Sequence, residues 1–344
     1  MDKQSKQYKG PFLILFIILI IVALFSMKYG AVNISLDEIY SGISKWVHNS
    51  GDLTLNERIF TEIRLPRVLL CIIVGATLAV GGTLMQALFR NPIVEPGLVG
   101  TSSGAAFGAA LYFVLGGVFR FNAGEWTLPI AACSGGILST VLVFVLARSK
   151  DTGKSSIVTL LLTGIAINAL FMSGVGFLSY IARDPQARSI TFWYLGTLSG
   201  ANWHSVIITG TITITCIIIA LRYAKQLNAL MMGEEEAQYL GINVKRLKLI
   251  VLLINVVMVA IATAFVGVIS FVGLIVPHFL RIIKGSDNRY LIRNGALLGG
   301  ILLTLSDLLA RMILRPAELP IGIVTSIIGV PIFIILLRRK NYFF

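Results

Sequence analysis

Long apolar runs separated by short polar stretches organise the whole chain. Most of these runs reach the ~20 residues that a helix needs to cross the hydrocarbon core of a bilayer. Ten runs can be distinguished, at about 11–30, 66–88, 97–117, 126–148, 156–181, 203–222, 247–268, 271–283, 290–313 and 321–338. The run at 271–283 is short and partly polar, so it can lie at membrane depth only if protein surrounds it. The pattern predicts an all-α polytopic membrane protein with about ten transmembrane helices.

Composition agrees with a single transmembrane domain that covers residues 1–344. Hydrophobic residues make up 56% of the chain and charged residues 13%, and a bilayer can solvate that much apolar surface whereas a soluble domain cannot hide it. The first run, Pro11–Met27, follows Lys3, Lys6 and Lys9, as in a secretory signal peptide. It is longer than the ~7–15 apolar residues of such a signal, so we expect a retained first transmembrane helix.

The distribution of basic residues predicts the orientation of the chain. If the N-terminus is cytoplasmic, ten spans return the C-terminus to the same side, and 19 of the 29 Lys and Arg residues then fall in cytoplasmic segments. Such an excess of positive charge is typical of cytoplasmic loops. We therefore expect a multi-pass protein with both termini cytoplasmic, and the net charge of +13 requires no nucleic acid partner.

Two polar segments on the outer side are amphipathic. Residues 31–65 include Leu36–His48, which we expect to be helical, and residues 182–200 mix charged and aromatic side chains. Both segments are typical of surface helices that cover the mouth of a cavity, and solvated loops are the alternative.

On the cytoplasmic side, Leu227–Gly241 (LNALMMGEEEAQYLG) forms a short acidic insert between two spans. A channel or a membrane enzyme has little need of such an insert, whereas a chain that a partner moves needs a docking element. The alternative is that the triplet Glu234–Glu236 is only a solvated face.

The stretch Arg90–Ala106 interrupts helicity between two spans, because it contains Asn91, Pro92, Glu95 and Pro96. Polar, irregular backbone at membrane depth is tolerated only where it is buried or lines a water-filled route. We expect this stretch to line a pathway, with an ordinary tight turn as the alternative.

The chain has no convincing nucleotide-binding motif. Gly153-Lys154-Ser155-Ser156 is similar to the end of a P-loop, but Arg148 stands where that motif has its first glycine, and an apolar helix precedes it instead of a strand. Any ATP that drives this protein must be hydrolysed by a different polypeptide, and we expect no cofactor in this chain.

Ionisable side chains within the spans are scarce. The three cysteines show no metal-ligand spacing and the lone His278 is most simply structural, so we expect no metal site. Asp307 lies four residues before Arg311, a spacing that allows a pair on one helix face. The scarcity of ionisable side chains within the spans argues against a proton-driven secondary transporter and against a membrane-embedded enzyme. We therefore expect no catalytic residues.

Several short motifs occur in a fixed order along residues 60–335. They are Arg64-Leu-Pro-Arg67, Gly75-Ala-Thr-Leu-Ala79, Met85-Gln-Ala87, Asn91–Gly100, Phe192-Trp193, Gly233-Glu-Glu-Glu-Ala237, Phe271–His278 and Glu318-Leu-Pro-Ile-Gly322. Each motif alone is modest, but together they resemble the permease family of ABC importers for iron chelates, haem and vitamin B12.

The resemblance implies a homodimer in the bacterial cytoplasmic (inner) membrane, in which a second copy of the chain completes a central pathway. Two cytoplasmic ABC ATPase subunits, which use ATP and magnesium, would lie below the dimer. A periplasmic or lipoprotein substrate-binding protein would dock above it. The family also carries an inverted repeat of spans two to five against spans seven to ten.

The resemblance also assigns roles to individual residues. Arg64, Arg67 and Arg311 match arginines that receive carboxylates of the binding protein, with anchoring in lipid headgroups as the alternative. The coupling helices match residues at about 227–244, and those expected to meet the ATPase are Met232, Gly233, Glu234, Glu235, Ala237, Leu240 and Gly241. The residues expected along the translocation pathway and its gate are Asn91, Pro92, Ile93, Gly97 and Ser156.

The function that follows is ATP-driven import of an iron complex, a ferric siderophore or haem, with this chain as the passive transmembrane permease. Import of cobalamin (vitamin B12) is the alternative, and secondary transport is a distant one. The sequence does not select among the cargoes, because the binding protein of such importers does the selecting.

Overall fold

The computed structural model describes residues 2–30, 32, 34–48, 52–119, 124–147 and 157–338, and the described part is helical without strands. Its elements are α1 (Asp2–Lys28), α2 (Leu36–His48), α3 (Leu55–Arg58), η1 (Ile59–Arg64), α4 (Leu65–Phe89), α5 (Thr101–Phe119), η2 (Gly124–Trp126), α6 (Thr127–Leu146), α7 (Ile157–Ile181), α8 (Asp184–Tyr194), α9 (Trp203–Met232), α10 (Glu234–Tyr239), α11 (Val244–Val266), α12 (Val272–Lys284), α13 (Asn288–Ile313) and α14 (Ile321–Arg338).

The ten apolar runs are confirmed as ten helices: α1, α4, α5, α6, α7, α9, α11, α12, α13 and α14. Among the described residues, seven helices are long and apolar enough to cross a membrane, while α5 and α14 are apolar but shorter. The short run at 271–283 is α12, whose residues Val272–His278 are all buried. It packs against α4, α13 and α14, so protein surrounds its first half, whereas Phe279 and Ile283 further on are exposed.

Three boundaries differ most from the expectation, and the first is the start of α1 at Asp2, nine residues before the predicted 11. Helix α9 continues to Met232, ten residues beyond the predicted end at 222, because Leu227 and Leu230 are fully buried against neighbouring helices. The first part of the predicted docking insert is therefore spanning helix. Ahead of α4, the π-helical turn η1 joins α3 to α4 in one helical run from Leu55 to Phe89.

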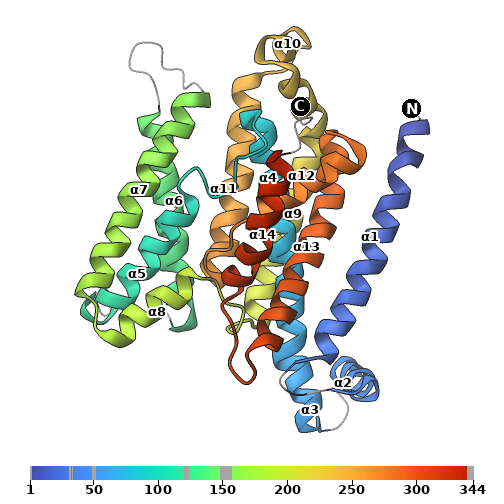
Figure 1. Cartoon of the computed structure of the whole chain (residues 1–344), viewed down its shortest axis with the longest axis vertical. Coiled ribbons are helices and arrows are strands. Elements are labelled where there is room, and N and C mark those ends of the chain that lie inside the picture. Colours follow the sequence, from blue (N-terminus) through green and yellow to red (C-terminus); the bar gives the residue numbers. More distant parts are fainter. Residues whose placement is uncertain are drawn as a thin grey trace.

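The helices form two groups around α4 (Figure 1). Helices α5, α6 and α7 pack together at one side with α8 beneath them, and α4, α9 and α11–α14 form the larger group. Helix α1 packs along α13 at the opposite edge. Glycine permits the closest approaches: a Cβ atom on Gly75 would collide with the backbone of Gly299, and one on Gly82 with the backbone of Gly273.

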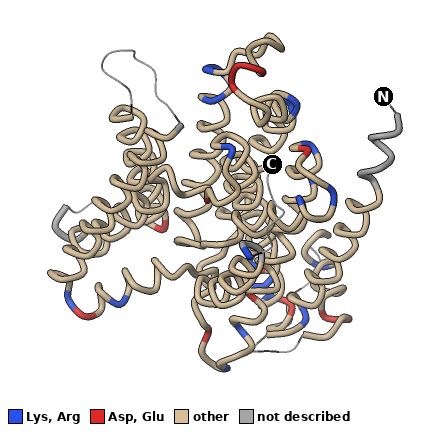
Figure 2. Tube along the Cα trace, turned by 45° about the horizontal axis from the view of Figure 1, so that its top comes forward, with Lys and Arg blue, Asp and Glu red and all other residues tan. Residues whose placement is uncertain are grey.

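The two ends of the bundle differ in what they carry. The start of α1, α10 and the end of α14 lie at one end, while α2, α3 and α8 lie at the other (Figure 1). Charged residues gather towards these two ends, and most of the length between them is uncharged (Figure 2). This distribution is the one that a bilayer imposes on a bundle that crosses it.

Candidate functional site

A cavity with several polar groups in its walls lies where two interruptions of the spanning helices meet. The first is the linker 90–100 between α4 and α5, and the second is the linker 267–271 between α11 and α12. The Glu95 carboxylate accepts a hydrogen bond from the Phe271 N–H at 3.1 Å, and the Asn255 side chain donates to the Pro96 carbonyl at 2.9 Å. These bonds satisfy backbone groups that would otherwise be unpaired at membrane depth.

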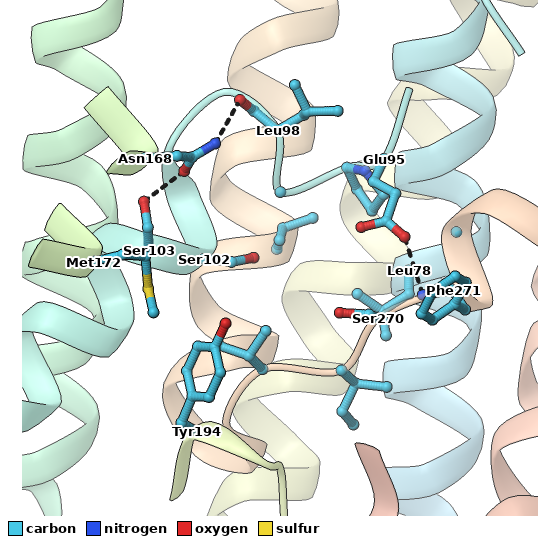
Figure 3. A pocket seen from close by; sticks show the side chains of 16 residues that line it. Leu78, Glu95, Leu98, Ser102, Ser103, Asn168, Met172, Tyr194, Ser270 and Phe271 are labelled. Atoms are coloured by element: carbon cyan, nitrogen blue, oxygen red, sulfur yellow. Dashed lines mark hydrogen bonds between the residues drawn. The ribbon is translucent and has the colours of Figure 1, made fainter. Parts of the chain in front are cut away.

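The cavity has a volume of about 260 Å³ and is lined mainly from α5, α7, α8 and the two linkers. Its polar lining comes from Glu95, Ser102, Ser103, Asn168, Tyr194 and Ser270. Asn168 joins two of its walls, because it accepts from the Ser103 hydroxyl at 2.5 Å and donates to the Leu98 carbonyl at 3.2 Å (Figure 3). The second carboxylate oxygen of Glu95 points into the same space (Figure 3).

Of the five residues expected along the pathway, Gly97 lines this cavity. Asn91, Pro92 and Ile93 lie in the turn after α4, where the Asn91 side chain accepts from the Ile93 N–H at 3.0 Å, and they do not line the cavity. Ser156 lies outside the described residues.

The sequence analysis did not single out Asn168, Tyr194 or Ser270. Asn168 carried a usable signal, because it is a lone amide inside the apolar run 156–181. Tyr194 and Ser270 carried none, since they reach the cavity from a surface helix and a linker.

A second cluster of charged residues lies towards the end of the bundle that carries α2. Asp307 is 1% exposed and pairs with Arg67 and with Arg311, each at 2.8 Å. Arg67 also reaches Glu318 at 3.0 Å, on the segment between α13 and α14. The expected ion pair of Asp307 with Arg311 is therefore present, and Arg67 from α4 forms a second ion pair with the same carboxylate.

Arg64 and Arg311 bind the end of α1. Arg64 donates to the Met27 carbonyl at 2.7 Å and to the Lys28 carbonyl at 2.9 Å, and Arg311 donates to the Ser26 hydroxyl at 2.7 Å. The last carbonyls of a helix have no partner within the helix and carry partial negative charge, so two guanidinium groups stabilise this end.

The three arginines expected to receive carboxylates of a binding protein differ in how they are held, and their docking role stays a prediction. Arg64 and Arg311 are each 6% exposed, and their guanidinium groups bond to other parts of the same subunit. A carboxylate from outside could reach them only by breaking those bonds. Arg67 differs, because it lines a cavity of about 260 Å³ together with the half-exposed Glu318.

The acidic insert forms the short helix α10 at the opposite end. Gly233 ends α9 and begins α10 with φ 156°, and a Cβ atom there would collide with the Glu236 carboxylate. Ala237 is fully buried, and Glu234 pairs with Lys248 of α11 at 2.7 Å. These contacts fix the direction in which α10 projects from the bundle.

A polar network ties the base of α10 to the bundle. Asn228 donates to the Asp287 carboxylate at 2.9 Å and accepts from the Asn288 N–H at 2.8 Å, so the end of α9 is held to the start of α13. Burial alone would raise the pKa of Asp287, but its hydrogen bonds from Arg289 and Asn228 hold that pKa below its ordinary value. The carboxylate therefore stays charged at the helix N-terminus.

The seven residues expected to meet the ATPase divide into two groups. Gly233 and Ala237 are buried and shape the turn, and Glu234 is held by Lys248. The other four, Met232, Glu235, Leu240 and Gly241, are exposed. Tyr239 was not among the expected residues, although it is 87% exposed beside Leu240. An aromatic residue inside an acidic insert was the signal that could have found it.

No group of three or more histidine, cysteine or acidic side chains that could hold a metal ion occurs in the described ranges. The three cysteines are free, and two of them, Cys71 and Cys216, are buried within helices.

Comparison with known proteins extends over nearly the whole chain. The chain is 40% identical over 327 residues to the hemin transport system permease protein HmuU of Yersinia pestis, and the aligned region covers 95% of both chains. It is 38% identical over 302 residues to the vitamin B12 import system permease protein BtuC of Pectobacterium atrosepticum, covering 86% of this chain and 88% of that one.

The fold matches a solved structure as well. An inward-facing metal-chelate type ABC transporter superposes with a TM-score of 0.82 at 30% sequence identity, covering 95% of this chain and 98% of that chain. The model of the FecCD transport family matches residues 18–339. The resemblance inferred from the short motifs is thereby confirmed, and the chain belongs to the FecCD transport family.

Proposed function

We propose that this permease carries an iron complex, a ferric siderophore or haem, across the cytoplasmic membrane as the transmembrane subunit of an ABC importer. The observation that carries the proposal is the cavity at the meeting point of two helix interruptions. Transporters place substrate sites at such interruptions near the middle of the membrane. The 40% identity to a hemin permease favours an iron complex, and the 38% identity to a vitamin B12 permease makes cobalamin the second candidate.

A second copy of the chain would complete the pathway. One subunit supplies a cavity of about 260 Å³, which is below the roughly 300–1,000 Å³ of a typical small-molecule pocket. A bulky metal chelate therefore needs a wider passage, of which this cavity is one wall. In a homodimer the same lining residues from both subunits would face one another across a two-fold axis.

Docking of a substrate-binding protein would centre on Arg67 and Glu318. Glu318 already occupies one edge of the Arg67 guanidinium at 3.0 Å, and it is exposed enough to be displaced. A carboxylate from a periplasmic or lipoprotein partner would replace it with a pair of the same charge and geometry. Arg64 and Arg311 would then support Arg67 from inside without meeting the partner.

The exposed side of α10 would dock to a cytoplasmic ATPase subunit, one for each copy of the chain. Tyr239 and Leu240 supply apolar contact area, and Glu235 adds negative charge beside them. ATP and magnesium would bind only to those subunits. Their closure on nucleotide would pull α10, and the connection to α9 and α13 through Asn228 and Asp287 would carry the motion into the bundle.

Transport would follow alternating access in this arrangement. The pathway would open first towards the binding protein and then towards the cytoplasm, with both termini and α10 on the cytoplasmic side. The cavity should hold its cargo weakly, because a tight site would retain the chelate. Its hydroxyl and amide groups are set among apolar side chains, with Glu95 as the charged residue, and this mixed lining suits brief contacts.

The proposal can be tested by uptake in a strain that lacks this chain. Labelled haem, ferric siderophore and cobalamin would be supplied separately, with and without the restored wild-type chain. We expect restored uptake of one iron complex, and loss of that uptake when the partner ATPase carries an inactive nucleotide site. Restoration of cobalamin uptake alone would select the second candidate. Uptake that persists without an active ATPase would overturn the ABC importer.

A further inference from the structure

Helix α2 presents one side to the rest of the protein. Ile39 and Gly42 are buried, and the Lys45 ammonium reaches the Glu57 carboxylate of α3 at 2.9 Å. The Ser41 hydroxyl donates to the same carboxylate at 2.6 Å. Contacts with α3 and η1 therefore fix both the position and the rotation of α2.

A second side of α2 is apolar and uncovered. Leu36, Tyr40, Ile43 and Val47 are 59%, 78%, 42% and 63% exposed. They follow one another at intervals of four, three and four residues, so they form a single stripe along the helix. The exposed polar residues Asp37, Ser44 and His48 lie roughly 100° around the helix from this stripe. The helix thus has separate protein-facing, apolar and polar sides.

The position of α2 indicates what covers the stripe. The helix crosses the direction of α1 and α4 just beyond the end of α1 (Figure 1). The apolar side chains of α1, such as Phe25 near that end, are exposed along its length, as expected for a helix that faces lipid. Helix α2 therefore lies at the end of an apolar surface that a bilayer would cover.

Aromatic residues lie beside α2, at the end of the bundle that carries this helix. Trp46 of α2 stacks on Trp203 at the start of α9, with ring centroids 5.1 Å apart. The Trp203 indole N–H donates to the Thr61 carbonyl of η1 at 3.1 Å. Tryptophan and tyrosine concentrate where the hydrocarbon core meets the headgroups, because their rings are apolar and their polar atoms need partners.

We propose that α2 lies in the headgroup region of the outer leaflet, with the stripe Leu36, Tyr40, Ile43 and Val47 against the acyl chains. Amphipathic helices that lie flat in the interface bind in this way. The occupant of the stripe is phospholipid, so α2 holds the connection between α1 and α4 at a fixed membrane depth. This inference rests on the membrane placement in the proposed function, and it adds a lipid-binding surface to it.

Site-directed spin labelling tests the proposal in the full-length protein. Single cysteines would replace Tyr40 or Val47 on the stripe, and Asp37 or Ser44 on the polar side as matched controls. The protein would be reconstituted in vesicles of phosphatidylethanolamine and phosphatidylglycerol. Accessibility to oxygen, which concentrates in lipid, would be compared with accessibility to a water-soluble nickel chelate. The background would carry the substitutions Cys71→Ala, Cys133→Ala and Cys216→Ala.

We expect labels at Tyr40→Cys and Val47→Cys to favour oxygen over nickel several-fold more than labels at Asp37→Cys and Ser44→Cys. Equal nickel accessibility on both sides would overturn the proposal, because it would place the stripe in water. Low accessibility of the stripe to both reagents would also overturn it, since a protein surface would then cover the stripe. Uptake measured on the same variants reports separately on the proposed function.

Discussion

At the scale of single residues, the arginines near α2 show how the structure adds partners that a sequence motif does not reveal. Arg64 and Arg311 occupy the motif positions that suggest docking, yet their donors bond to α1 and to Asp307. A buried ion pair contributes little net stability over a hydrophobic replacement, but removing one partner leaves an uncompensated charge. Asp307 matters most here, because it compensates two guanidinium groups.

Replacing Asp307 by asparagine should therefore destabilise the protein strongly. We expect a loss of about 3–5 kcal/mol in the free energy of unfolding, because Arg311 would remain buried without its counter-charge and Arg67 would keep only the partly solvated Glu318. Glu318→Gln is the matched control and should cost about 0–1 kcal/mol, since that carboxylate is partly solvated. Denaturant unfolding in lipid nanodiscs measures the free-energy loss in both variants. Equal losses would contradict the claim that Asp307 is the main counter-charge of the buried arginines.

The contact of Arg64 with α1 makes a separate prediction. Arg64→Met keeps most of the side-chain length but removes the donors to the Met27 and Lys28 carbonyls. We expect amide hydrogen exchange in the last turn of α1 to rise by about tenfold, as one or two hydrogen bonds of about 1 kcal/mol each are lost. The exposed Arg315→Met should leave exchange unchanged. A similar response from both variants would show that Arg64 does not hold α1.

At the scale of the elements, helix packing depends on glycine at defined crossings. Gly82 of α4 lies so close to Gly273 at the start of α12 that no Cβ atom fits. Gly82→Ala should therefore cost about 1–3 kcal/mol in unfolding free energy through overpacking. Gly176→Ala on α7 is the control, because nothing lies within 4 Å of a Cβ atom there, and it should be neutral or stabilising. Thermal unfolding in detergent would compare the stabilities of the two variants. If Gly176→Ala lost more stability than Gly82→Ala, the close approach at Gly82 would be excluded.

Helix α10 provides a prediction about binding. Tyr239→Ala should weaken affinity for the ATPase subunit by at least about tenfold, because exposed aromatic side chains dominate such interfaces when they become buried. Gln238→Ala, exposed on the same helix, should change affinity less than about threefold. Titration of the purified ATPase onto nanodiscs measures both. Equal affinities would place the ATPase contact elsewhere.

The elements could be predicted from sequence wherever the bilayer dictates them. An apolar run must become a helix in lipid, so the ten spans and the helix at 36–48 were predicted near their observed bounds. The extension of α9 could not be, because Leu227 and Leu230 are apolar residues whose burial depends on neighbouring helices. The burial of Arg64 could not be predicted either, since its partners are backbone carbonyls of α1 and leave no pattern in the sequence.

At the scale of the whole molecule, the cavity joins the two groups of helices. Asn168 and Met172 approach it from α7, whereas Glu95, Ser270 and Phe271 reach it from the linkers of the larger group (Figure 3). A change in the separation of the two groups would therefore change the cavity directly. Motion at α10 can reach the cavity through α11, which runs from α10 to the linker 267–271 in the cavity wall.

Filling the cavity should block transport without disturbing assembly. Ser102→Phe would place a large ring in a space of about 260 Å³, and we expect uptake of the cargo to fall by at least about tenfold as the route narrows. Thr215→Phe is the control, because Thr215 lies exposed on α9 and outside the cavity lining. Binding of the ATPase and its nucleotide hydrolysis should remain in both variants, since α10 lies at the far end of α11 from this cavity. Normal uptake through Ser102→Phe would mean that the cargo takes another route. Loss of ATPase binding in the same variant would instead indicate a misfolded protein, and the smaller Ser102→Leu would then repeat the test.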